Sequence, residues 1–220
     1  MPTYSPIEWD ATGERLYENG IDHGVLYLQD SSGNYPNGVA WNGLTSFSES
    51  PDGGDVTDLW ADNIKYGSLR AAENYKGSIE AFTYPEEFAA CDGSATVATG
   101  VYAGQQKRQP FGFCCRTMVS SDTSTEGTET YKLHLVYNAT VSPSEKTYET
   151  INDSPDAITF SWDFDTIPIN VTGYKPTACI TIDSTKADST KLAALKDKLY
   201  GTSSAAAYLP LPDEVISTMS

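Results

Sequence analysis

Two strongly patterned stretches, close together in the chain, constrain its fold more than any other feature. Residues 131–140 carry Leu133, Leu135 and Tyr137 at every second position, the spacing of a half-buried strand. Residues 157–167 show the same period. Their apolar positions are Ile158, Phe160, Trp162 and Phe164, and their polar positions are Thr159, Ser161, Asp163 and Asp165. Because successive side chains of a strand point to opposite faces, this second strand has one face for a core and one for water.

Further strands are predicted on both sides of this pair. Their apolar runs, bounded by turn-forming residues, lie at residues 24–29, 39–47, 77–84, 111–118 and 177–183. The first two runs should form a hairpin, because Gly, Pro and Asn fill the short segment between them. The link between the two patterned strands is polar. In this link, residues 142–151 contain a candidate helix start and residues 152–155 favour a turn.

Two short helical segments are predicted beside the strands. Residues 85–91 begin with a proline and two acids and are soon followed by a glycine, as short helices often are. Residues 189–200 carry three leucines at helical spacing and are followed by Gly201. The pattern alone therefore predicts a strand-rich, mainly β domain with two short helical segments beside the strands.

Length and composition favour a single domain over residues 1–220. All-β units of 220 residues commonly fold around one core. With 30 acidic and 14 basic residues the formal charge is −16, which repels nucleic acid and anionic membranes. No apolar run reaches the roughly 18 residues of a membrane span. The first ten residues lack the pattern of a secretory leader, so we expect the chain to fold in a cytosol.

No catalytic, cofactor-binding or metal site is predicted. His23 lies beside a glycine and His134 lies within a strand, and no third ligand has a suitable spacing. Residues 100–104 are glycine-rich but lack the lysine of a phosphate loop. Pairs of carboxylates at glycosidase distances are expected only by chance. Buried free thiols, without metal-ligand spacing, are the expected state of Cys91, Cys114, Cys115 and Cys179.

A long acidic loop at about residues 48–66 is predicted to carry large apolar side chains. These side chains are Val56, Leu59, Trp60 and Ile64. So many of them are unusual in a solvated connection. Two interpretations follow from the residues alone: the loop folds over its own core, or it binds a partner with Trp60 as the anchor.

Residues 202–220 form the last segment and contain a Leu-Pro-Leu-Pro run with Leu209 and Leu211. Two prolines so close together leave few routes to regular structure within one chain. The segment is therefore expected to be either a loose tail or an arm that a neighbouring copy orders.

A monomeric β-sandwich that binds carbohydrate or acts in adhesion is an alternative function. Its stacking platform would use exposed aromatic side chains, namely Tyr35, Trp41, Trp60 and Tyr66. Such a module stays a monomer, whereas a self-assembling subunit presents self-complementary surfaces and edge strands. A measurement of size in solution separates the two.

Three long blocks of the sequence resemble one protein family. They are residues 37–67, residues 79–93, and residues 142–164 followed by Ile-Pro-Ile at 167–169. Together with residues 177–212, these blocks cover most of the chain, and they resemble the major tail tube proteins of long-tailed, non-contractile bacteriophages. None of the blocks is a chemical motif, so the resemblance implies a structural role and no enzyme activity. It also implies the fold, a mainly β sandwich or half-barrel of the phage tail tube type with a short flanking helix and a C-terminal helical arm at about residues 184–220.

The resemblance also implies partners and a location. Proteins of this family form hexameric rings that stack into a hollow tube, which encloses the tape measure protein and joins tail terminator and distal tail proteins. Phage DNA passes through the tube without specific binding, and no membrane partner is implied. The expected location is the tail of the virion, after assembly in the host bacterial cytoplasm.

Particular surfaces take roles from this resemblance. The loop at 48–66 and the arm at 184–220 are expected to lie between subunits or rings. Their contact residues would be Val56, Leu59, Trp60, Ile64, Leu209 and Leu211. The polar face of the strand at 157–167 is expected to line the lumen, and a wet outer surface is the alternative. Its residues are Thr159, Ser161, Asp163 and Asp165.

Overall fold

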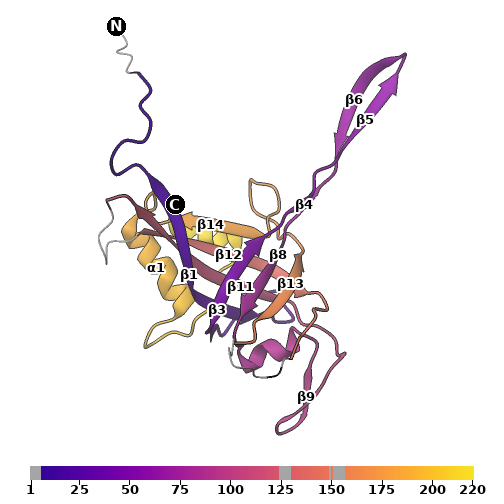
Figure 1. Cartoon of the computed structure of the whole chain (residues 1–220), viewed down its shortest axis with the longest axis vertical. Helices are drawn as coiled ribbons and strands as arrows, with labels where there is room; N and C mark the ends of the chain where they lie inside the picture. Colours follow the sequence, from indigo (N-terminus) through magenta and orange to yellow (C-terminus); the bar gives the residue numbers. More distant parts are fainter. Residues whose placement is uncertain (1–5, 124–129, 149, 151–156) are drawn as a thin grey trace.

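The structure, a computed structural model, describes residues 6–123, 130–148, 150 and 157–220 (Figure 1). It is mainly β, as predicted. The strands of the main sheet are β1 (Leu16–Leu28), β2 (Val39–Trp41), β3 (Leu44–Glu49), β8 (Lys76–Ala81), β11 (Phe111–Ser121), β12 (Thr130–Val141), β13 (Phe160–Thr166) and β14 (Cys179–Asp183). The other elements are β4 (Asp52–Gly53), β5 (Val56–Ala61), β6 (Ile64–Arg70), β7 (Glu73–Asn74), β9 (Ala95–Ala98), β10 (Val101–Ala103), the 3₁₀ helix η1 (Glu86–Ala90), α1 (Ser189–Tyr200) and α2 (Pro212–Met219).

Within the described residues, the main sheet has eight strands in the order β2-β1-β11-β12-β13-β8-β3, and β14 also pairs with β12. All of these pairs are antiparallel. Three smaller two-stranded units, β4 with β7, β5 with β6 and β9 with β10, extend from the body. Figure 1 shows β5 and β6 projecting from one end of the molecule and β9 lying at the other.

Strand β12 lies in the middle of this strand order, and one of its edges has two successive partners. Residues 132–136 pair with β14 and residues 139–141 pair with β13. Asn138 lies between them and has a φ of 51°, a left-handed conformation that Asn tolerates. The register between β11 and β12 shifts at the same place. This bulge redirects β12 from one partner to the other and bends the sheet.

One side of the sheet is covered by an aromatic core. Phe88 of η1 lies 4.5 Å from Trp41 of β2 and 5.1 Å from Trp162 of β13, measured between ring centroids. The indole Nε1 of Trp41 donates a hydrogen bond to the carbonyl of Thr83 at 3.0 Å. The short helix thus closes this side, because its phenylalanine is packed among aromatic side chains of two strands.

The two helices cover the other side of the sheet. Every second residue of β12, including Leu133, Leu135 and Tyr137, packs there against the leucines of α1, as predicted. Asp188 caps α1 by accepting hydrogen bonds from the amides of Thr190 and Lys191. On the other face of β12, Val136, Ala139 and Val141 belong to the aromatic core, so the strand has buried side chains on both faces.

Several boundaries differ from the predictions. The strand expected at 39–47 is two strands with different partners, separated at Gly43, whose φ of 76° suits glycine. The segment at 85–91 forms a 3₁₀ helix. Residues 142–148 form no helix, so the candidate helix start is wrong there, and residues 151–156 lie outside the described residues. Ile158 is exposed, because it precedes the first pair between β13 and β8.

Candidate functional site

The segment predicted as a loop at 48–66 is instead part of a long β-ribbon. Strands β5 and β6 pair along their length and continue through the short β4–β7 pair toward the body. The turn residues Asp62 and Asn63 both have positive φ, 51° and 64°, as a two-residue type I′ hairpin requires. We refer to residues 52–74 as the hairpin arm, and Figure 1 shows that it projects well beyond the main sheet.

The hairpin arm is amphipathic. The cross-strand pairs Thr57–Leu69, Leu59–Gly67 and Ala61–Ile64 share one face, because paired residues of antiparallel strands lie on the same side. This apolar face carries no charged side chain. The opposite face contains the charged residues of β5 and β6. They are Asp58, Lys65 and Arg70, and the Nζ of Lys65 lies 2.7 Å from the carboxylate of Asp58.

Large apolar side chains of the hairpin arm are exposed on both faces. Leu59 and Ile64 of the apolar face are 41% and 62% exposed, and Trp60 of the opposite face is 68% exposed. Four of the six residues predicted to contact another subunit therefore share one ribbon, with Val56 also exposed. Tyr66 and Leu69, which are outside the predicted contact set, are exposed there too.

A polar face lies on the three neighbouring strands β13, β8 and β3, opposite the aromatic core. Asp163 pairs with Ser78, and Ser78 pairs with Ser48 on its other side. Ser161, Glu80 and Ser46 form the next row in the same way. The structure therefore places the predicted Ser161, Asp163 and Asp165 within a wider surface of short polar side chains. We refer to it as the polar face, formed by Ser46, Ser48, Lys76, Ser78, Glu80, Ser161, Asp163 and Asp165.

Lys76 connects the polar face to the hairpin arm. Its Nζ lies 3.3 Å from Asp165 of β13 and 3.2 Å from Asp52 of β4. Hydrogen bonds from Lys76 hold the pKa of the Asp52 carboxyl below its usual value. Thr159, the fourth residue predicted on this face, is exposed but precedes β13. The face thus carries three carboxylates against one amine.

The C-terminal segment is ordered by its own chain, which corrects the prediction for residues 202–220. Leu209 is 2% exposed in the core under the helices, and its amide donates to the carbonyl of Tyr35 at 3.0 Å. The hydroxyl of Tyr137 donates to the carbonyl of Pro210 at 3.0 Å. Leu211 is half-buried and packs against the same core. Neither leucine is a free contact surface in this arrangement.

The aromatic platform expected for a carbohydrate-binding module is not formed. Tyr35 and Trp41 are buried, while Trp60 and Tyr66 lie on the hairpin arm. The Tyr35 hydroxyl accepts a hydrogen bond from the Asn138 amide at 2.9 Å, so it belongs to the packing around the bulge. These four side chains do not make one surface on which a sugar could stack.

The two histidines, considered above as possible metal ligands, lie at separate places in the structure. Burial lowers the pKa of His134, and its Nε2 lies 2.9 Å from the hydroxyl of Thr117. His23 lies in β1, at a register shift, with φ of 52°. Within the described part of the chain, no group of three or more His, Cys, Asp or Glu side chains is placed to hold a metal ion. The thiols are free, buried at 91, 114 and 115, and half-buried at 179.

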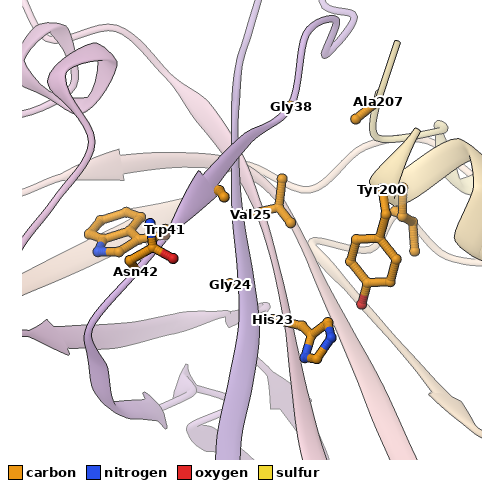
Figure 2. Close-up of a pocket in the computed structure, with 10 residues that line it drawn as sticks. His23, Gly24, Val25, Gly38, Trp41, Asn42, Tyr200 and Ala207 are labelled. Carbon is orange, nitrogen blue, oxygen red and sulfur yellow. The ribbon is translucent and has the colours of Figure 1, made fainter. Parts of the chain in front are cut away.

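A hollow lies between β1, β2 and the end of α1 (Figure 2). Its volume is about 540 Å³, and the rings of His23 and Tyr200 face each other across 5.8 Å at one side. Glycines and apolar side chains form most of its wall, with Asn42 as the remaining polar side chain. The lining itself contains no carboxylate, thiol or amine, and the imidazole Nδ1 of His23 lies 3.0 Å from the carboxylate of the neighbouring Asp22.

Among the described residues, no helix combines the length and the apolar character needed to cross a lipid bilayer. No protein-family model and no curated protein matches the chain. Three solved structures have weak similarity to it, each over 80% of this chain. A chain of the sixfold-symmetrised baseplate of the anti-feeding prophage has a TM-score of 0.39 with 9% identity, over 97% of that chain. Chains of the sheath/tube terminator and of the sheath-tube complex of the PVC extracellular contractile injection system have TM-scores of 0.34 and 0.31, with 9% and 11% identity, over 99% and 94% of their length.

Proposed function

We propose that this chain is a structural subunit of a bacteriophage tail tube that self-assembles into stacked hexameric rings. The single observation that carries the proposal is the hairpin arm, a projecting ribbon with exposed leucine, isoleucine and tryptophan side chains. The sequence resemblance of residues 37–67, which include much of the arm, points in the same direction. In this role the chain works by presenting surfaces and has no enzyme activity.

An isolated two-stranded ribbon is at best marginally stable in water, so an arm of this kind favours a partner surface. Burying one large apolar side chain contributes about 1.5–3 kcal/mol. The apolar face, with Leu59, Ile64 and Leu69, can therefore contribute several such terms when a second copy covers it. Val56 and Trp60 on the other face add to the contact. We assign these residues to an interface between subunits or rings.

The polar face suits the wall of a channel. Its serines are short and its acids repel phosphate, so neither would hold a passing DNA duplex. We propose that Asp163 and Asp165 point into the lumen, which encloses the tape measure protein before infection and conducts the genome afterwards. Tail terminator and distal tail proteins would be further partners. The site of action would be the tail of a long-tailed, non-contractile virion, assembled in the host bacterial cytoplasm.

The test is assembly of the purified chain and of two matched variants. The triple variant L59S/I64S/L69S removes the apolar face, while D58S/K65S changes the opposite face of the same ribbon. Size in solution and negative-stain electron microscopy would be followed as the protein is concentrated. We expect rings and tubes from the wild type and from D58S/K65S, and folded monomers from the triple variant. A wild-type chain that stays monomeric at every concentration would contradict the proposed function.

A further inference from the structure

Three basic side chains of this acidic protein have no partner among the residues that the structure describes. The chain has 14 lysines and arginines, and most of them form ion pairs, hydrogen bonds or ring contacts. Among the described residues, the side chains of Arg70, Lys107 and Lys175 make none of these contacts. In a chain with 30 acids, an unpaired cation is uncommon enough to ask what it faces.

Two of these three cations lie at one groove. The groove has a volume of about 580 Å³ and runs between the base of the hairpin arm and residues 168–179. Arg70 and Lys175 line it and are exposed, while Tyr75 and Cys179 are half-buried in it. We refer to it as the base groove. Its remaining lining includes one exposed acid, Glu73, and is otherwise mainly apolar, with Ala71, Ala72, Pro168 and Pro176.

The N-terminal segment has the opposite character. Ile7 and Trp9 are 74% and 79% exposed, and they alternate with Glu8 and Asp10. Among the described residues, neither of these two carboxylates forms an ion pair or a hydrogen bond. Residues 6–9 belong to no strand or helix. The segment therefore offers a large aromatic side chain flanked by two free acids.

The segment and the groove lie on opposite flanks of the molecule. In Figure 1 the N-terminal segment leaves the body at the left, whereas the hairpin arm and its base lie at the right. A contact between two different patches on two copies is head-to-tail, and such contacts close into rings when the rotation between copies allows it. The arrangement thus provides one contact per subunit around a ring.

We propose that residues 7–10 of one copy dock in the base groove of the next copy. Trp9 packs on the apolar floor around Tyr75, and Glu8 and Asp10 approach Arg70 and Lys175 at the rim. This inference rests on the proposed function and names a contact within the ring. Exposed ion pairs contribute little to affinity, so Trp9 supplies most of it and the charges set the orientation.

Charge reversal tests the pairing directly. R70E/K175E and E8K/D10K should each raise the protein concentration needed for ring formation, and the combination of all four should restore it toward the wild-type value. The matched control is Lys107→Glu, which reverses the remaining unpaired cation outside the groove and should leave assembly unchanged. We expect Trp9→Ala to raise the required concentration about tenfold or more, as loss of an aromatic anchor does. The thermal midpoint of the unassembled Trp9→Ala subunit should equal that of the wild type, because Trp9 is exposed.

Cys179 allows a second, independent measurement. In the variant Ile7→Cys, mild oxidation with oxidised glutathione should link the new thiol to Cys179 of the neighbouring copy, giving covalent oligomers on a non-reducing gel. Burial raises the pKa of the Cys179 thiol, so the reaction is best run at alkaline pH. The variants I7C/C179S and S48C, the latter with a cysteine on the polar face, should give no ladder.

The outcomes separate this inference from the proposed function. Tubes that form equally well from the wild type, Trp9→Ala and R70E/K175E, with no cross-link from Ile7→Cys, would overturn the docking inference alone. A wild-type chain that stays monomeric and gives no cross-link would overturn both. Cross-linked oligomers that depend on Cys179, together with rescue by the combined charge reversal, would support the docking.

Discussion

At the scale of single residues, burial distinguishes side chains that look alike in the sequence. Trp41 and Trp60 both lie within strands and directly after an apolar residue, yet one is buried among aromatic rings and the other is exposed on the hairpin arm. The period-two pattern correctly predicted which residues of β12 and β13 are buried. They are Leu133, Leu135 and Tyr137 in β12, and Trp162 and Phe164 in β13. It could not predict that Tyr35 packs on Asn138, because that contact joins residues more than 100 positions apart.

His134 provides a prediction about pH. Burial lowers its pKa from 6.5, although Glu49, at 3.6 Å, and Glu18 act in the opposite direction. In the unfolded chain the imidazole binds a proton below about pH 6.5, whereas in the folded chain it does so only at a lower pH. The contribution of neutral His134 to the free energy of unfolding is therefore fully present above that pH and is lost as the pH falls toward the lowered pKa. Between about pH 7 and pH 5.5 we expect the thermal midpoint of the wild type to fall more than that of His134→Gln. Parallel curves would contradict this.

At the scale of elements, the strands of the main sheet were predictable, whereas the hairpin arm and the C-terminal segment were not. The hairpin arm was predicted as a loop because its glycines and acids favour turns. Its actual signal was Asp62-Asn63 between two alternating runs, since both residues tolerate the positive φ of a tight hairpin. The C-terminal segment was predicted to be a loose tail or an arm ordered by a neighbouring copy. The sequence could not show its order within one chain, because that order comes from a bridge between Leu209 and the distant Tyr35.

The C-terminal segment therefore stabilises the monomer. We expect Leu209→Ala to lower the free energy of unfolding by about 2–5 kcal/mol, the usual cost of removing a buried leucine side chain. Ile216→Ala, on the partly exposed side of α2, is the control and should cost clearly less. Denaturant unfolding of the unassembled chain would measure both. Equal, small losses would mean that residues 202–220 detach from the body in solution.

At the scale of the whole molecule, the curled sheet separates two kinds of surface. Its β13-β8-β3 part presents the polar face, and the hairpin arm projects from the end of the same part (Figure 1). Lys76 pairs with acids of both, so the polar face and the base of the arm are held together. A subunit that contacts its neighbours through the arm would thereby hold its polar face in a defined orientation within the assembly.

The lumen assignment leads to a prediction about genome release. Replacing Asp163 and Asp165 with lysine should permit tube formation but slow DNA ejection, more strongly at low salt, where attraction to phosphate reaches further than about 8 Å. E86K/E87K makes the same change of charge at η1, on another part of the surface, and serves as the control. Ejection would be timed from virions carrying each variant. Unaltered kinetics for D163K/D165K, or equal slowing in both variants, would contradict the assignment.

The pairing of β1 with β11 has a consequence for how the chain folds. Leu28 pairs with Phe111 and Leu16 with Ser121, so these two strands join residues that are 83 to 105 positions apart, and such distant pairings form slowly. The hairpin arm closes across a two-residue turn, and local hairpins form within about 1–10 μs. A newly made chain is therefore expected to form the hairpin arm, with its exposed apolar side chains, before its body has folded. Crowding of nascent chains would then favour premature association through the arm, and a low rate of synthesis would favour ordered assembly.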